Sequence, residues 1–525
     1  MKKKLFLKIL IGIAALMVVW IVIATTLVEP WIRTKIESSL NTPDSGMAIK
    51  INDVDISLLT FGIKFEKIII SGKAIEGNDP DSVGQIAFID CRGINVFKAL
   101  LSDEWRFNTL TVSDFIFSNQ FPLSKRSLHP FTSPAKIFVK NIYLDLVEMS
   151  LLDSATARSY KIYNTQLSMH NLRLSKGEKI FNYTAEKFDI QSPHLVLTSP
   201  NGMYTFIADT VAYSSMSETL YVQSFKIQPN YKDYDFTSRE RYQTDRVEAT
   251  FSQNKVYGIC ADDFIKDGNI IFTSVEIGHL DLDIFRDRRK PFDHKNKPVL
   301  LDVLYKYPHR IDIDSLHIRN GKIKYTEHAE DANRPGNVSF RDIKGGIYSL
   351  SNDTLYKNKY DTLVIRAEAM VYGKSKLRIV TKARLFEPDR RFHMTGRLAP
   401  MSLEDLNPIL ERNVFMYAHG KINSLDFDFT ANKNKATGRV LFLYSDLLIT
   451  LKNKTTDDTT GLKEIILTRL ANKAIVDSNP YRREEARIGT IDYKRDPEKM
   501  FFNYSLKAVI SGMKSSVAKT SKKKK

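Results

Sequence analysis

The stretch RIDIDSLHIRNGKIKYTEHAE, Arg310 to Glu330, decides what kind of protein this sequence encodes. Its centre, Asp312-Ile313-Asp314, puts two carboxylates one residue apart, and such pairs can hold a divalent metal ion. The stretch also alternates apolar and polar residues, which is the period of a half-buried β-strand. In the strand interpretation the apolar face consists of Ile311, Ile313, Leu316, Ile318, Ile323 and Tyr325, with a register slip between Ile313 and Leu316. The metal interpretation makes the protein a candidate enzyme, and the strand interpretation does not.

The same alternation returns in many runs between Ala48 and Leu451, each ended by Gly, Asn, Asp or Pro. In the first run it slips once, at a bulge expected over Asn52-Asp53. Further positions expected on the apolar face are Ile49, Ile51, Val54, Ile56, Leu282, Ile284, Leu425, Phe427 and Phe429. The pattern therefore predicts a mainly β protein with one wet and one apolar sheet face.

A sheet of this length cannot stay flat, because the twist between neighbouring strands accumulates. It can wrap its apolar face inward as an elongated groove, pack against a second sheet, or split into sandwiches. The periodicity alone does not choose between these three arrangements.

The Asp-x-Asp pattern occurs four times inside such runs, at Asp53/Asp55, Asp281/Asp283, Asp312/Asp314 and Asp426/Asp428. A metal site would occur once, at a loop or strand end, with other ligands converging on it. Four copies within alternating runs are typical of a solvated strand face. We therefore expect these aspartates to be wet-face residues and not metal ligands.

Other catalytic signals are absent from the sequence. It has no phosphate-binding glycine loop, no G-x-S-x-G and no H-E-x-x-H, and its ten histidines form no i, i+4 pairs. The 30 phenylalanines and 23 tyrosines are spread through the strands and not gathered with basic residues on one module, so nucleic-acid binding is not indicated. We predict neither an enzyme nor a cofactor.

The N-terminus carries the clearest local signal. Ile9 to Val28 is 20 residues without a charge, which as a helix spans about 30 Å and matches a hydrocarbon core. The alternative is a cleaved signal peptide, but its apolar region is shorter and its A-x-A cleavage pattern is missing here. Four lysines before the span predict that residues 1–8 are cytoplasmic and that the rest of the chain lies across the membrane. A short amphipathic helix, EPWIRTKIESSLN, follows.

A helical segment is expected over 461–518, after the β-rich region 29–460. LKEIILTRLANKAIV carries Leu462, Ile465, Ile466 and Leu470 on one helix face. A second helix, after Asp496-Pro497, has an apolar stripe of Phe502, Leu506, Val509, Ile510, Met513 and Val517. Its small-residue face consists of Ser505, Ala508, Gly512 and Ser516. This second helix either closes the end of the β core or touches a membrane, helped by the basic tail 519–525.

The overall charge is +17, with lysines concentrated at both ends of the chain. This suits a surface that meets anionic head groups. The two cysteines, Cys91 and Cys260, have no metal-site or disulfide-framework spacing, and we expect them to be small buried side chains.

The chain resembles the AsmA-like proteins of Gram-negative envelopes, including their branches of unknown function. At the N-terminal end the resemblance lies in the anchor, in EPWIRTKIESSLN and in IKINDVDISLLTFGIKFEKIIISG. At the C-terminal end it lies in LAPMSLEDLNPILERN, in GKINSLDFDFTANKNKATGRVLFLYSDLLITLKNK and in RDPEKMFFNYSLKAVISGMKSSV. The resemblance implies an inner-membrane anchor and a periplasmic β-rich groove, related to bridge-like lipid transfer proteins, that binds phospholipid or another envelope lipid. It supplies no catalytic residues.

The predicted function is thus that of a membrane-anchored periplasmic lipid-binding or lipid-transfer protein contributing to phospholipid movement and outer-membrane homeostasis. An outer-membrane or envelope protein is a candidate partner. One alternative is an assembly factor whose β body is a scaffold without a lipid conduit. A further alternative is an envelope enzyme of unknown chemistry.

Overall fold

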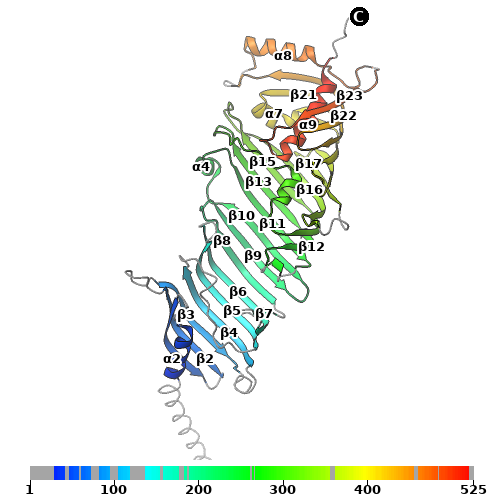
Figure 1. The fold of residues 1–525 in the computed structure, drawn as a ribbon. Helices are drawn as coiled ribbons and strands as arrows, with labels where there is room; N and C mark the ends of the chain where they lie inside the picture. The colour runs from blue at the N-terminus through cyan, green and yellow to red at the C-terminus, as the bar shows by residue number, and fades with distance from the viewer. Residues whose placement is uncertain are drawn as a thin grey trace, which may run out of the picture. The chain divides into compact units, whose positions relative to one another are not determined.

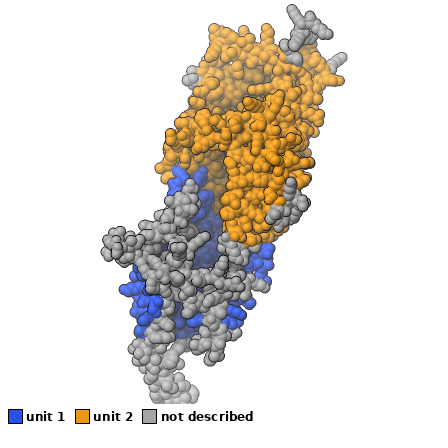
Figure 2. Space-filling view, in the orientation of Figure 1, with its two compact units in different colours: residues 1–222 blue, residues 223–525 orange. Residues whose placement is uncertain are grey.

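The structure is a computed structural model that describes residues 29–41, 47–57, 61–72, 82–94, 104–118, 136–153, 158–176, 183–185, 189–259, 263–264, 267–354, 361–454, 459–482 and 484–519. The chain is mainly β, as predicted. It divides into two compact units, residues 1–222 and 223–525, which Figure 2 colours separately. No change in sequence composition marks this division. The predicted membrane span, 9–28, lies outside the described residues, and no described helix is long and apolar enough to cross a membrane.

Unit 1 is a sheet in which each strand mostly pairs with the next strand along the chain (Figure 1). Its strands are β1 (Met47–Ser57), β2 (Gly62–Gly72), β3 (Ser82–Arg92), β4 (Glu104–Ser118), β5 (Lys136–Asp153), β6 (Arg158–Lys176), β7 (Tyr183–Ala185), β8 (Asp189–Thr198) and β9 (Tyr204–Ser214). The pairings among these described strands are antiparallel except that of β4 with β5, which is parallel. The sheet is therefore mixed.

Helix α2 (Glu29–Leu40), the expected short helix, covers the free edge of β1 with its polar side chains. Asn41, just after the helix, accepts a hydrogen bond from Ile49 N–H at 2.5 Å and donates one to Ile49 C=O at 2.7 Å. Glu37 accepts another from Ile51 N–H at 2.6 Å. An open sheet edge invites pairing with other chains, so these contacts satisfy backbone groups that would otherwise be exposed.

Unit 2 contains a second mixed arrangement of strands. After β10 (Thr219–Pro229), which spans the unit boundary, come β11 (Asp245–Tyr257), β12 (Ile270–Ile277), β13 (His279–Asp287), β14 (Ile311–Ile318), β15 (Gly321–His328), β16 (Gly336–Ser351), β17 (Thr362–Val371), β18 (Ser375–Arg384), β19 (Phe392–Leu398), β20 (Met401–Ser402), β21 (Met416–Ala431), β22 (Lys435–Leu451) and β23 (Ile488–Lys494). Its helices are α4 (Asp233–Ser238), α6 (Leu300–Tyr305), η3 (Leu403–Leu406), α7 (Asn407–Asn413), α8 (Leu462–Ala474) and α9 (Phe501–Val517).

Two strand pairs in unit 2 are parallel: β12 with β14 and β13 with β15. Parallel neighbours need a long crossover connection, and the segment between β13 and β14, which includes α6, provides it. The other pairings among the described strands β11 to β23 are antiparallel.

The ladders are interrupted at both places where a slip was expected, but neither ladder shifts its register. The β1–β2 ladder steps from Ile51–Ile68 to Asp53–Glu66 without pairing Asn52 to Lys67, and Lys67 has a φ of 52°. In β14 the pairings with β12 and β16 likewise pass over Asp314. In β1 the residues on the two sides of the gap, Ile51 and Val54, are nevertheless buried in one cluster with Ile68.

Helix α9 packs on β22 and β23 through its small-residue face, at the C-terminal end of the sheet (Figure 1). Ala508 and Gly512 are buried there, and a Cβ at Gly489 of β23 would collide with the backbone oxygen of Gly512. Part of the predicted apolar stripe faces outward, since Phe502 and Leu506 are exposed. The small residues let the helix approach the strands closely, so α9 closes the core at this end.

Candidate functional site

In unit 1 one apolar side chain from each of eight strands lines up directly opposite its neighbours. This N-terminal row consists of Ile56, Ile63, Cys91, Leu110, Ile142, Met169, Ile190 and Tyr213, from β1, β2, β3, β4, β5, β6, β8 and β9. Directly opposed residues on neighbouring strands bring their Cβ atoms to about 5 Å. The register therefore creates an unbroken apolar line across the sheet of unit 1.

Every member of the N-terminal row is partly exposed. In a packed core these side chains would be fully buried, and on a solvent-exposed face polar residues would be expected in their place. A second line beside it, Val54, Phe65, Ile89, Val112, Leu144 and Leu167, follows the same register. Only Val54 of these six is fully buried. The apolar face of unit 1 is thus wide and incompletely covered.

The opposite face of unit 1 is polar at the same level. The residues next to the N-terminal row form a parallel line of Asp55, Lys64, Asp90, Thr111, Tyr143, Ser168 and Gln191. Successive side chains of a strand point to opposite faces, so the two lines lie on opposite sides of the sheet. The sheet is therefore amphipathic, as the alternation predicts.

Cys91 reports on the environment of the N-terminal row. Burial raises the pKa of its thiol to about 12, and the nearby Asp90 carboxylate adds to the effect. The thiol is free and neutral at physiological pH. The row thus provides an apolar environment even though its members are partly exposed. Cys260, the other cysteine, lies outside the described residues.

Unit 2 has a corresponding C-terminal row. It consists of Val275, Leu316, Ile347, Ile365, Thr381, Met394 and Phe429, from β12, β14, β16, β17, β18, β19 and β21. The first four members are partly exposed, whereas Thr381, Met394 and Phe429 are buried. The burial increases where α9 covers the sheet: Phe392 stacks edge-to-face on Phe429, Phe501 and Tyr504.

The structure brings most of the predicted apolar-face residues into such cross-strand lines. Leu282 lies opposite Ile323, and Ile284 lies opposite Tyr325. Ile311, Ile313 and Ile318 lie opposite Ile270, Phe272 and Ile277. In β1, Ile51 and Val54 are buried in a small cluster with Ile68, against which Ile49 packs.

Six of the predicted lining residues are buried, namely Ile51, Val54, Ile313, Leu425, Phe427 and Phe429. Leu425, Phe427 and Phe429 are buried in the large cluster that also contains Tyr504 and Ala508 of α9. Ile313 is also buried, at 8% exposure. The cause is coverage by other elements, which alternation within one strand cannot reveal. The residues of the N-terminal row from Cys91 onward were not predicted as lining residues, although the same alternation runs through their strands.

In two of the four Asp-x-Asp patterns, both aspartates contact a Lys, Arg or His side chain on a neighbouring strand. Asp281 and Asp283 face Lys322 and Lys324 on β15 at 3.4 and 3.2 Å. Asp426 and Asp428 of β21 face Arg397 and His393 of β19 at 3.5 and 2.9 Å. In the first pattern, Asp53 is largely exposed and lies 3.9 Å from Arg33 of α2.

Asp312 departs from the expected wet face. It is only 6% exposed and lies 3.1 Å from Arg310, which also contacts Asp353 at 2.6 Å. Its carboxylate is therefore part of a buried ionic cluster. Among the described residues, no group of three or more His, Cys, Asp or Glu side chains is placed to hold a metal ion.

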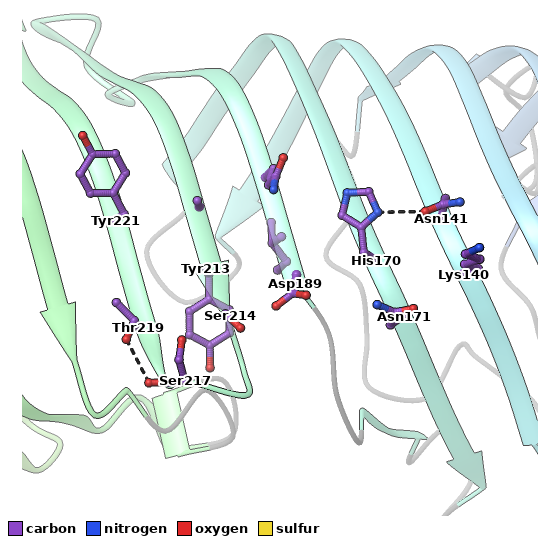
Figure 3. Close-up of a pocket in the computed structure, with 13 residues that line it drawn as sticks. Lys140, Asn141, His170, Asn171, Asp189, Tyr213, Ser214, Ser217, Thr219 and Tyr221 are labelled. Carbon is purple, nitrogen blue, oxygen red and sulfur yellow. Dashed lines mark hydrogen bonds between the residues drawn. The ribbon is translucent and has the colours of Figure 1, made fainter.

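A polar cavity of about 510 Å³ lies open on unit 1 (Figure 3). Its lining includes Lys140, His170 and Asp189, and the imidazole of His170 is hydrogen-bonded to the Asn141 side chain at 3.0 Å. Ile190 and Tyr213 of the N-terminal row also line this cavity. The lining residues Asn141, His170, Asp189 and Ser214 pair with one another one position away from the row, so the cavity lies mainly on the polar face and reaches the row only at Ile190 and Tyr213.

Comparison with family models, with curated proteins and with solved structures finds no match to this chain. The function is therefore inferred from the two rows and from the polar cavity of unit 1.

Proposed function

We propose that the protein binds lipid acyl chains along the N-terminal row and along the partly exposed members of the C-terminal row, and that it passes lipids along them between membranes. The observation that carries this proposal is the N-terminal row itself. Eight consecutive apolar side chains in register, each partly exposed, have an unfavourable contact with water that an acyl chain would relieve.

The polar cavity of unit 1 supports the same proposal. A phospholipid has an apolar tail and a charged head, and its binding surface needs both kinds of contact. The cavity offers Lys140, Asp189 and hydrogen-bonding side chains next to Ile190 and Tyr213 of the row. A head group held there would lie on the polar side of the sheet, near only the last two members of the row, Ile190 and Tyr213.

The cellular setting is part of the proposal. The uncharged segment 9–28 serves as an inner-membrane anchor, and the β body lies in the periplasm, as the resemblance to AsmA-like proteins implies. The apolar face then lines a groove, and transport follows a lipid gradient or is driven by partner proteins. The wider role is phospholipid movement and outer-membrane homeostasis.

One observation favours the scaffold alternative for part of the chain. The last three members of the C-terminal row are buried beneath α9 and neighbouring elements. There the apolar face is ordinary core. Lipid binding is therefore proposed for unit 1 and for β12 to β17, and not for the strands that α9 covers.

The test compares a row residue with its neighbour on the opposite face. The variants are Met169→Lys, in the N-terminal row, and Ser168→Lys, the adjacent residue on the polar face. The measurements on the purified full chain are co-purified lipid by native mass spectrometry, transfer of a fluorescent phospholipid between vesicles, and melting temperature.

We expect Met169→Lys to fold, since the lysine stem can extend toward solvent at a partly exposed position, and to lose most of its bound lipid and transfer activity. Ser168→Lys should keep both. Full lipid load and full transfer in Met169→Lys would refute the proposal, as would a wild-type protein that carries no lipid.

A further inference from the structure

Helix α8 is oriented with its polar residues toward the protein. Thr468 accepts a hydrogen bond from Leu451 N–H at 2.9 Å, and Asn472 bonds both backbone groups of Ile449 in β22. Glu464 is 7% exposed and accepts a hydrogen bond from the Asn453 side chain at 2.9 Å. These three residues are spaced four apart, so they share one helix face.

The opposite face of α8 is apolar and exposed. The exposed fractions are 77% for Leu462, 36% for Ile465, 48% for Ile466, 41% for Leu467 and 58% for Leu470. The sequence pattern correctly places four of these residues on one face, but their face points away from the sheet. An amphipathic helix normally buries its apolar face, so an outward one indicates a surface that something else covers.

The charge around this face is positive. Lys463, Arg469 and Lys473 are exposed on α8, and the helix's one acidic residue is the buried Glu464. The C-terminal end of the chain meets the helix at the same place: Lys519 N–H donates to Ala474 C=O at 2.9 Å, and its ammonium donates to Lys473 C=O at 2.9 Å. The sequence then continues as Thr-Ser followed by four lysines.

We propose that α8 is an interfacial docking helix that inserts its apolar face into the head-group region of an anionic lipid membrane. Apolar residues flanked by Lys and Arg are the composition of helices that lie in the plane of a membrane surface. The long basic side chains reach anionic head groups while the apolar side chains enter the acyl boundary. The lysine-rich tail adds attraction at the end of the helix to which it is tied.

The charge pattern of α8 favours a lipid surface over a protein as its binding partner. A protein partner or a second copy of the chain would have to match an apolar face crossed by three cations and followed by four more lysines. An anionic membrane matches both features without any specific shape. Docking through α8 does not depend on whether the rows carry lipid.

The experiment measures flotation of the full chain with vesicles. The protein is held in phosphatidylcholine nanodiscs, so that the apolar segment 9–28 is already occupied, and is mixed with vesicles of pure phosphatidylcholine or with 30 mol% phosphatidylglycerol. We expect binding to the anionic vesicles only, weakened by 0.5 M NaCl because salt screens the charges.

The double variant Ile466→Ser/Leu470→Ser should reduce binding at least tenfold. The control Phe502→Ser/Leu506→Ser removes two exposed apolar residues from α9 and should bind like the wild type. Circular dichroism and melting temperature show that both variants fold. Unchanged binding of the α8 variant, equal binding to both vesicle types, or self-association that the α8 variant abolishes would each overturn the proposal.

Discussion

The side-chain amide of Asn472 forms hydrogen bonds with both backbone groups of Ile449. The Ile449 N–H donates to Asn472 Oδ1 at 2.9 Å, and Asn472 Nδ2 donates to the Ile449 C=O at 2.7 Å. Asn41 makes the same pair of bonds with Ile49 in unit 1. In each unit an asparagine in or just after a helix thus takes the place of a neighbouring strand. Because Asn472 holds the polar face of α8 against β22, the apolar face of the helix points outward.

Asn472→Leu should therefore destabilise the β22 edge. The substitution keeps the volume but leaves two backbone groups without a partner, which costs about 1–3 kcal/mol. The measurements are the melting temperature of the full chain and hydrogen exchange at the Ile449 amide, which should become much faster. Lys473→Ala, at the next and exposed position, is the control. Equal protection of Ile449 in both variants would contradict the edge-capping role.

The two types of Asp-x-Asp aspartate should differ in their contribution to stability. Asp312→Asn weakens a buried ionic cluster and should cost about 1–3 kcal/mol. Asp281→Asn removes a half-exposed pair with Lys322 and should cost less than about 1 kcal/mol. Thermal denaturation of the two variants makes the comparison. Equal shifts in melting temperature would show that Asp312 is solvated after all.

The Cys91 thiol should react slowly with alkylating reagents. Only the thiolate is nucleophilic, and with its pKa raised to about 12 very little thiolate exists at pH 7.5. In a Cys260→Ser background we expect alkylation by N-ethylmaleimide to be at least about 100-fold slower than for an exposed thiol. The rate should recover when the protein is unfolded in urea. Rapid alkylation of the folded protein would place Cys91 outside an apolar environment.

Local sequence features accounted for part of this fold. The alternation predicted the β content, the interruptions beside Asn52 and Asp314, and the shared face of residues such as Leu282 and Ile323. These features depend on neighbours along the chain, which the sequence displays directly.

Other features depend on contacts between distant segments. The alternation cannot show that Leu316 aligns with Ile347, that β4 and β5 run parallel, or that Arg310 bridges Asp312 to Asp353. Nor can the periodicity of a helix show which of its faces points toward the sheet. In α8 it groups Leu462, Ile466 and Leu470 correctly, but backbone groups on the edge of β22 attract the polar face and leave these residues outside.

The central claim is that the N-terminal row contacts lipid, and site-specific photocrosslinking in cells tests it most directly. A photoreactive phenylalanine derivative is placed at Ile142 or Met169 in the row, or at Tyr143 or Ser168, which pair with each other on the opposite face. The account predicts lipid adducts, detected by mass spectrometry, at Ile142 and Met169 and none at Tyr143 and Ser168. Adducts at all four positions, or at none of them in folded protein, would contradict it.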